Sequence, residues 1–117
     1  MRLIDETNGN VLAEKVELAD SFWKRFRGLM LRGRFPEGNA LVFTPPKPGR
    51  YGIHMFFVRF PIDLLYLDSV FVVVELRTGL KPWRMYSPKL IANYLIELPQ
   101  GSISRSNVEI GHKLTLQ

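Results

Sequence analysis

The sequence predicts a compact, mostly antiparallel β fold, either a sandwich or a barrel, with one short α-helix near residues 20–28. Two observations support this class. Short apolar runs of strand length recur along the chain, and segments rich in Gly, Pro, Asn and Ser separate them. A single segment has the spacing of an amphipathic helix. The length of 117 residues suits one domain, so we expect residues 1–117 to form a single unit.

The N-terminal segment predicts a β-hairpin. The runs MRLID and VLAEKVEL flank ETNGN, in which Asn8-Gly9 favours a type I′ turn because both central residues of that turn need positive φ. In the second arm, the alternation predicts a core face made of Leu12, Val16 and Leu18.

Residues 19–31, ADSFWKRFRGLML, change to the period of a helix. The apolar members of this segment are Phe22, Trp23, Phe26, Leu29 and Met30, which fall on one helical face. Asp20 or Ser21 can cap the N-terminus, and Gly28 can end the helix. We therefore predict the short helix near residues 20–28, with Arg25 on its polar side.

The remaining elements follow in order. After the strand ALVF, the proline-rich segment TPPKPGR predicts a stiff, exposed loop that either connects strands or lines a site. Three strand-like runs come next: YGIHMFFV, IDLLYLD and VFVVVELR. The third is apolar on both faces, as in a strand covered on each side. We then expect a strand NYLIELP, a loop QGSISRSN, and two short strands around Gly111.

Composition narrows the classes of site. The chain has no cysteine, which excludes disulfides, thiolate metal sites and cysteine nucleophiles. Its first ten residues do not form a signal peptide, and no apolar stretch reaches the roughly 18 residues of a membrane helix. We therefore expect a cytoplasmic protein without a membrane partner, whose oligomeric state stays open.

The net charge of +5 is unevenly distributed. Residues 1–20 carry five acids and two bases, whereas residues 21–90 carry twelve bases and four acids. The basic residues form three clusters, which are Lys24, Arg25, Arg27, Arg32 and Arg34; Lys47, Arg50 and Arg59; and Arg77, Lys81, Arg84 and Lys89. If the fold brings the clusters together, they form a face that attracts anions; otherwise they are solvated on several faces.

Several segments resemble a known family. FWKRFRGLMLR, HMFFVRFPIDLLYLD, LKPWR and LIELPQGSI with VEIGHKL occur in that order, over about residues 19–116, and are similar to the domain of unknown function family 192 in its archaeal form. The resemblance implies a mostly β domain of sandwich or jelly-roll type and no established activity. Phe57 stands where many relatives carry Asn, and Gln100 where many carry Ala, so a site built on that Asn does not transfer.

His54 and Asp63 are ionisable residues within apolar surroundings. In an extended strand, His54 shares a face with Phe56 and Val58, so it is either a neutral core histidine or a ligand contact or general base. Asp63 follows a corner at Phe60-Pro61, and a buried carboxylate needs partners. Arg25, Arg84 or backbone N–H groups could supply them, and we favour Arg25. Asp63 is then either a structural clamp or part of a site.

Trp83 and Arg84 follow a proline and form the second candidate. Adjacent indole and guanidinium groups are used to bind bases, sugars or phosphates, although a Trp packed at the end of a sandwich is the alternative. The candidate ligand-binding residues are therefore Arg25, His54, Asp63, Trp83 and Arg84.

The sequence favours binding over catalysis. It contains no P-loop, dinucleotide fingerprint or nucleophile elbow, and two histidines without cysteine disfavour a zinc site. No cofactor or metal is expected. The first hypothesis is a module that binds an anionic small molecule or a nucleic acid through a basic face. The alternatives are a small enzyme with a site at His54, Asp63 and Arg84, or a structural protein-interaction domain.

Overall fold

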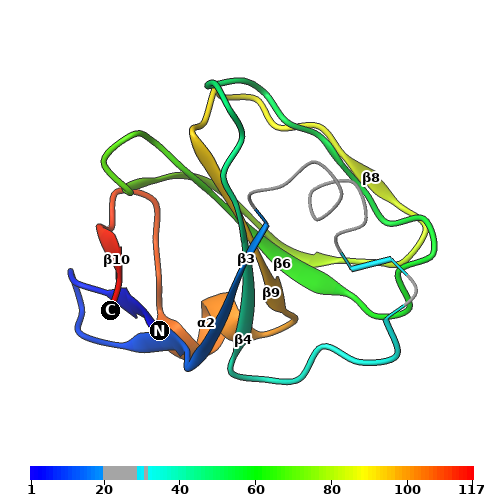
Figure 1. Ribbon diagram of the computed structural model, residues 1–117, viewed down its shortest axis with the longest axis horizontal. Coiled ribbons are helices and arrows are strands. Elements are labelled where there is room, and N and C mark those ends of the chain that lie inside the picture. Colours follow the sequence, from blue (N-terminus) through cyan, green and yellow to red (C-terminus); the bar gives the residue numbers. More distant parts are fainter. Residues whose placement is uncertain (20–28, 31) are drawn as a thin grey trace.

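The computed structural model describes residues 1–19, 29–30 and 32–117 (Figure 1). In this part of the chain, ten strands form three sheets, and one short helix completes the secondary structure. The strands are β1 Leu3–Asp5, β2 Val11–Ala13, β3 Lys15–Ala19, β4 Asn39–Phe43, β5 Ile53–His54, β6 Ile62–Leu67, β7 Val73–Leu80, β8 Met85–Tyr86, β9 Tyr94–Pro99 and β10 Leu114–Leu116, and the helix is α2 Ser102–Ser106. The predicted helix near residues 20–28, including Arg25, lies outside the described residues.

The mostly β class is confirmed, and the described strands do not close into a barrel. A five-stranded sheet in the order β3-β4-β9-β6-β7 crosses the middle of the molecule (Figure 1). Its strands pair antiparallel except β3 and β4, which are parallel. The sheet β10-β1-β2 lies on one side of it with α2, and the ribbon β5-β8 lies on the other.

The described residues form two apolar core clusters, one on each face of the five-stranded sheet. Side chains alternate along the central strands, so that Leu65 and Leu67 join the first cluster while Leu64 and Tyr66 join the second. All six residues of β6 are buried. The run VFVVVELR, predicted to be covered on each side, packs Val73 in the first cluster and Val74 against the second, although β7 is an edge strand and is less buried than β6.

The N-terminal hairpin is confirmed, but its turn differs from the prediction. Gly9 has a φ of 80°, whereas Asn8 is not in the left-handed region, so the turn is not type I′. The Asn8 side chain instead accepts a hydrogen bond from the Asn10 N–H and donates to the Ser106 carbonyl. The second arm divides between β2 and β3, which belong to different sheets, and Leu12, Val16 and Leu18 all pack in or against the first cluster as predicted.

Three local predictions were wrong. YGIHMFFV contributes only the two-residue strand β5, because the chain turns at residues 55–58. QGSISRSN contains the helix α2 and is not a simple loop. The C-terminal segment contains one strand, β10, since residues 109–112 form a turn.

Candidate functional site

Asp63 is buried, and backbone groups satisfy its carboxylate. Its side chain lies on β6 with 1% of its surface exposed. One carboxylate oxygen accepts the Gly79 N–H at 2.9 Å, and the other accepts the N–H groups of Gly101 at 3.1 Å and Ile103 at 3.0 Å. Backbone N–H groups, one of the three partner types considered from the sequence, thus satisfy this carboxylate. Arg25, the favoured partner, lies outside the described residues.

The position of Asp63 explains two irregularities of the backbone. Two residues of β7, Thr78 and Gly79, face it across the ladder, which makes a β-bulge with Gly79 at a φ of 60°. On its other side, the carboxylate receives the N–H groups at the start of α2, where no local side chain caps the helix. Asp63 therefore joins β6, β7 and α2.

Four rings form a continuous cluster on the surface. The His54 ring lies 5.3 Å from that of Phe56, measured between centroids, and Trp83 lies 6.0 Å from Phe56 and 5.1 Å from Phe57. Phe56, Phe57 and Trp83 are 41%, 50% and 58% exposed. The rings come from two segments that meet at Met55. The Met55 carbonyl accepts a hydrogen bond from the backbone N–H of Trp83 at 2.9 Å, and the Met55 N–H donates to the Arg84 carbonyl at 2.7 Å.

Basic residues adjoin this ring cluster along the chain. Arg59, Lys81 and Arg84 are exposed and lie within two residues of Phe57 or Trp83 in the chain. None of the three forms an ion pair within the described part of the chain. The two segments that build the surface, residues 50–60 and 81–89, contain no Asp or Glu. We call the four rings with these three cations the aromatic–basic face.

The structure therefore brings together three of the five candidate residues, His54, Trp83 and Arg84. His54 is exposed, so of the two alternatives drawn from the sequence the neutral core histidine does not apply. Asp63 is buried elsewhere with its oxygens occupied by backbone donors, which leaves it outside the face. Sequence reasoning missed Phe56 and Phe57, because the apolar run around them was interpreted as one strand.

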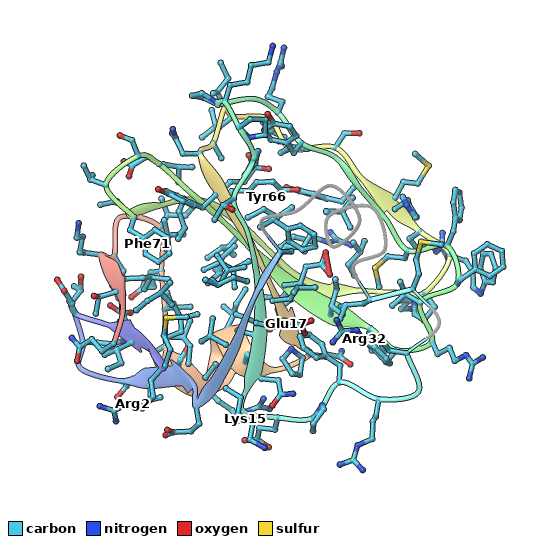
Figure 2. The ribbon with its side chains drawn as sticks, viewed as in Figure 1. Arg2, Lys15, Glu17, Arg32, Tyr66 and Phe71 are labelled. Carbon is cyan, nitrogen blue, oxygen red and sulfur yellow. The ribbon has the colours of Figure 1, made fainter. Side chains whose placement is uncertain are left out.

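A second group of ionisable residues is buried on the β5-β8 side of the central sheet. Glu97 on β9 lies in register between Leu41 and Leu64 and is 5% exposed. Burial raises the pKa of its carboxyl to about 8, although the positive charge of Arg32 lowers it. Arg32 itself donates two hydrogen bonds of 2.9 Å to Glu17, and the two side chains lie close together in Figure 2.

Glu75 holds the loop after β8. Its carboxylate accepts a short hydrogen bond from the Tyr86 hydroxyl and others from the N–H groups of Lys89 and Leu90, both at 3.0 Å. Burial, and then the hydrogen bond to Glu75, raise the pKa of Tyr86 to about 12. Burial also raises the pKa of Tyr66 well above its usual range, and its hydroxyl donates to the Tyr51 carbonyl. The hydrogen bonds of Glu75 and Tyr66 thus attach neighbouring loops to the central sheet.

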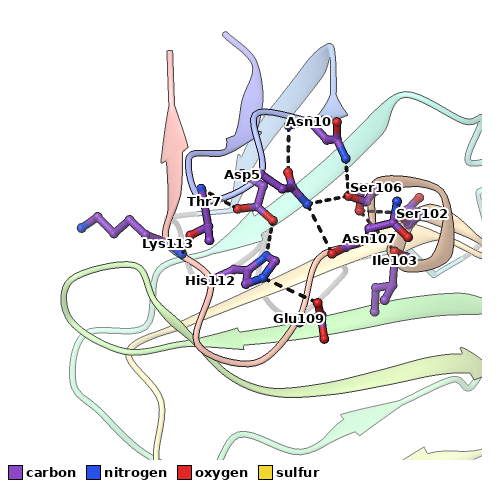
Figure 3. A network of polar contacts seen from close by, with 11 residues as sticks. Asp5, Thr7, Asn10, Ser102, Ile103, Ser106, Asn107, Glu109, His112 and Lys113 are labelled. Atoms are coloured by element: carbon purple, nitrogen blue, oxygen red, sulfur yellow. Dashed lines mark hydrogen bonds and ion pairs between the residues drawn. The ribbon is translucent and has the colours of Figure 1, made fainter.

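His112 lies between two carboxylates. Its Nδ1 lies 2.6 Å from the buried Asp5 carboxylate, and its Nε2 lies 3.8 Å from Glu109 (Figure 3). The Ser106 hydroxyl donates to the Ser102 carbonyl at 2.8 Å. This network ties β1 and the end of α2 to the C-terminal segment.

A cleft of about 280 Å³ opens beside β2 and α2, and several of the polar groups that line it are paired with each other or with the backbone. Arg105 forms an ion pair with Glu37 at 3.0 Å, and the Ser102 hydroxyl donates to the Pro99 carbonyl at 2.7 Å.

Within the described residues, no three His, Asp or Glu side chains group as metal ligands would. No described helix has the length and apolar character to cross a membrane.

Fold and surface together define a layered β domain with an exposed aromatic–basic face. The chain belongs to the family domain of unknown function 192, described as an uncharacterized ACR, whose model matches residues 3–116. This confirms the resemblance noted in the sequence. The UPF0127 protein of the archaeon Thermococcus sibiricus is 48% identical over 115 residues, which cover 96% of this chain and 72% of that protein.

Two crystal structures share the fold. A protein of unknown function from Novosphingobium aromaticivorans has a TM-score of 0.87 and 18% sequence identity, with 99% of this chain and 84% of that chain covered. A proposed transcription regulator from Sinorhizobium meliloti has a TM-score of 0.83 and 23% identity, with 97% and 89% covered. At these identities the likeness establishes the fold.

Proposed function

We propose that this protein is a binding module for a nucleic acid, and that the aromatic–basic face is the contact surface. The observation that carries the proposal is a cluster of exposed rings whose two segments also contain three exposed cations, which form no ion pair within the described residues, and contain no carboxylate. Cations bind phosphates, and rings bind the flat faces of bases or pack on sugars. A solvated basic surface would not need three aromatic side chains that are 41–58% exposed.

The shape of the face favours a polymer over a small anion. Small-molecule sites are concave and bury most of their ligand. Here Phe57 and Trp83 stand on turns with half or more of their surface in solvent, and the cations flank them on both segments. A chain of phosphates can contact Arg59, Lys81 and Arg84 together, whereas one sugar phosphate would contact few of them.

Binding should weaken as salt increases, because each phosphate contact releases counterions. For a single strand, the slope of log affinity against log salt is about −0.7 per contact, so three cations predict a slope of about −2. Fluorescence anisotropy of a labelled oligonucleotide, measured over a series of salt concentrations, gives this slope. Lys81→Gln and Arg84→Gln should each make the slope shallower by about 0.7.

Arg2→Gln is the matched control. Arg2 is also exposed, but it precedes β1 on the side of the molecule away from β8 (Figures 1 and 2). This variant should keep both the affinity and the salt slope of the unmodified protein. An affinity that is flat with salt for RNA, DNA and sugar phosphates alike would rule out the proposed function.

A further inference from the structure

Each of the two segments of the aromatic–basic face contains a turn of the same kind. In the first turn the Val58 N–H donates to the Met55 carbonyl, and in the second the Arg84 N–H donates to the Lys81 carbonyl. The third residue of each turn has a positive φ, which is 61° at Phe57 and 64° at Trp83. Pro82 precedes Trp83, and proline followed by a residue with positive φ is the pattern of a type II turn.

Aromatic residues are unexpected at this position. Glycine or asparagine normally occupies the third place of a type II turn, because Cβ makes the left-handed conformation unfavourable for other residues. The chain nevertheless puts Phe57 and Trp83 there, with half or more of each side chain in solvent. Burial in the core therefore does not compensate for the strain. Residues with strained backbone conformations cluster at active sites and ligand-binding sites.

From this geometry, and on the basis of the proposed function, we infer that the nucleic acid is single-stranded and that unpaired bases stack on Phe57 and Trp83. Cations attract single strands and duplexes alike, but the base faces of a duplex are already covered by neighbouring bases. A platform of exposed rings is therefore useful only for unpaired bases. The cations of the face attract any nucleic acid, and the exposed rings make the face selective for single strands.

The angles between the rings describe how the strand would bind. Trp83 is inclined by 63° to Phe57 and by 43° to Phe56. Bases that lie flat on Phe57 and on Trp83 cannot stay parallel to each other, so the strand must separate two of its bases at this point. Contact between Met55 and both Trp83 and Arg84 holds the two turns at this inclination.

The test compares labelled RNA and DNA strands of about 12 nucleotides with duplexes of the same length at low salt. We expect both kinds of single strand to bind at least about tenfold tighter than either duplex, since one stacked base contributes about 5- to 150-fold in affinity. Trp83→Ala and Phe57→Asn should each weaken single-strand binding within this range. Asparagine tolerates the left-handed conformation, so the second variant keeps the turn.

Ile91→Ala is the matched control for the ring variants. It removes a side chain that is 64% exposed but belongs to the loop before β9, outside the face. Its affinity should equal that of the unmodified protein. Thermal unfolding of each variant, followed by circular dichroism, separates a loss of binding from a loss of folding.

The outcomes distinguish the two proposals. The single-strand inference would be overturned if single strands and duplexes bound with equal affinity. In that case Lys81→Gln and Arg84→Gln would weaken binding, whereas Trp83→Ala and Phe57→Asn would not. The proposed nucleic-acid binding would then remain in place. Absence of salt-dependent binding to every nucleic acid would overturn both. Binding to vesicles that contain phosphatidylserine, without binding to nucleic acid, would identify the face as a membrane contact and would also overturn both.

Discussion

Asp63→Ala should destabilise the fold by about 3–5 kcal/mol in urea unfolding experiments. The substitution removes a carboxylate that accepts three backbone N–H groups at 2.9–3.1 Å, and removing one partner of a buried charged interaction costs about 3–5 kcal/mol. Without it, the bulge at Gly79 and the first turn of α2 lose their shared acceptor, and three donors remain in a region shielded from water.

Asp68→Ala is a suitable control for this prediction. Asp68 also accepts backbone hydrogen bonds, from the N–H groups of Val70 and Val72 at 3.0 Å, but it lies in the half-buried turn between β6 and β7. A local contact of this type contributes about 1 kcal/mol. Similar costs for the two alanine variants would contradict the anchoring role of Asp63. An Asp63→Ala protein of full stability that had lost ligand binding would assign this carboxylate to a site.

Glu97→Gln should stabilise the protein at pH 8 and have little effect near pH 5. The pKa of the Glu97 carboxyl rises from 4.5 to about 8 in the folded protein. Between these pH values the folded state retains a proton that the unfolded state has released, so stability is complete below pH 4.5 and falls as pH rises to about 8. At about 1.4 kcal/mol per pH unit, the loss is at most about 5 kcal/mol.

Urea unfolding at pH 5 and at pH 8 tests this prediction. The Gln variant keeps the shape of the side chain but cannot ionise, so its free energy of unfolding should depend less on pH than that of the unmodified protein. The exposed Glu14→Gln change serves as the control and should leave the pH dependence unaltered. If Glu97→Gln and the unmodified protein lose the same stability between pH 5 and pH 8, another group is responsible for the loss.

Local patterns in the sequence were sufficient for much of the fold. The hairpin around Gly9, the strands β6, β7 and β9, and the core positions Leu12, Val16 and Leu18 were all predicted. Each depends on residues within one segment, where side-chain alternation and turn residues carry the information. The same reasoning identified Trp83 and Arg84 as candidates, because aromatic and basic residues adjoin in the chain.

The helix α2 illustrates what the sequence did not reveal. Its segment QGSISRSN has the composition of a loop, and no side chain within it caps the first turn. The cap comes from Asp63, which is 40 residues away from Ile103. A hydrogen bond between residues this far apart in the sequence depends on the order of the strands in the sheet. The local periodicity of apolar residues does not predict that order.

By itself, the sequence determined the β class, the positions of several strands, the family, and the presence of aromatic and basic residues in two segments. Only the tertiary structure decided that these segments meet at Met55 and that Phe57 and Trp83 contact each other. It also decided that Glu97 is buried between Leu41 and Leu64. The physical reason is that side-chain periodicity and turn residues determine structure over a few neighbouring residues. Burial, shifts of pKa and contacts between rings instead arise when strands that are distant in the sequence pair.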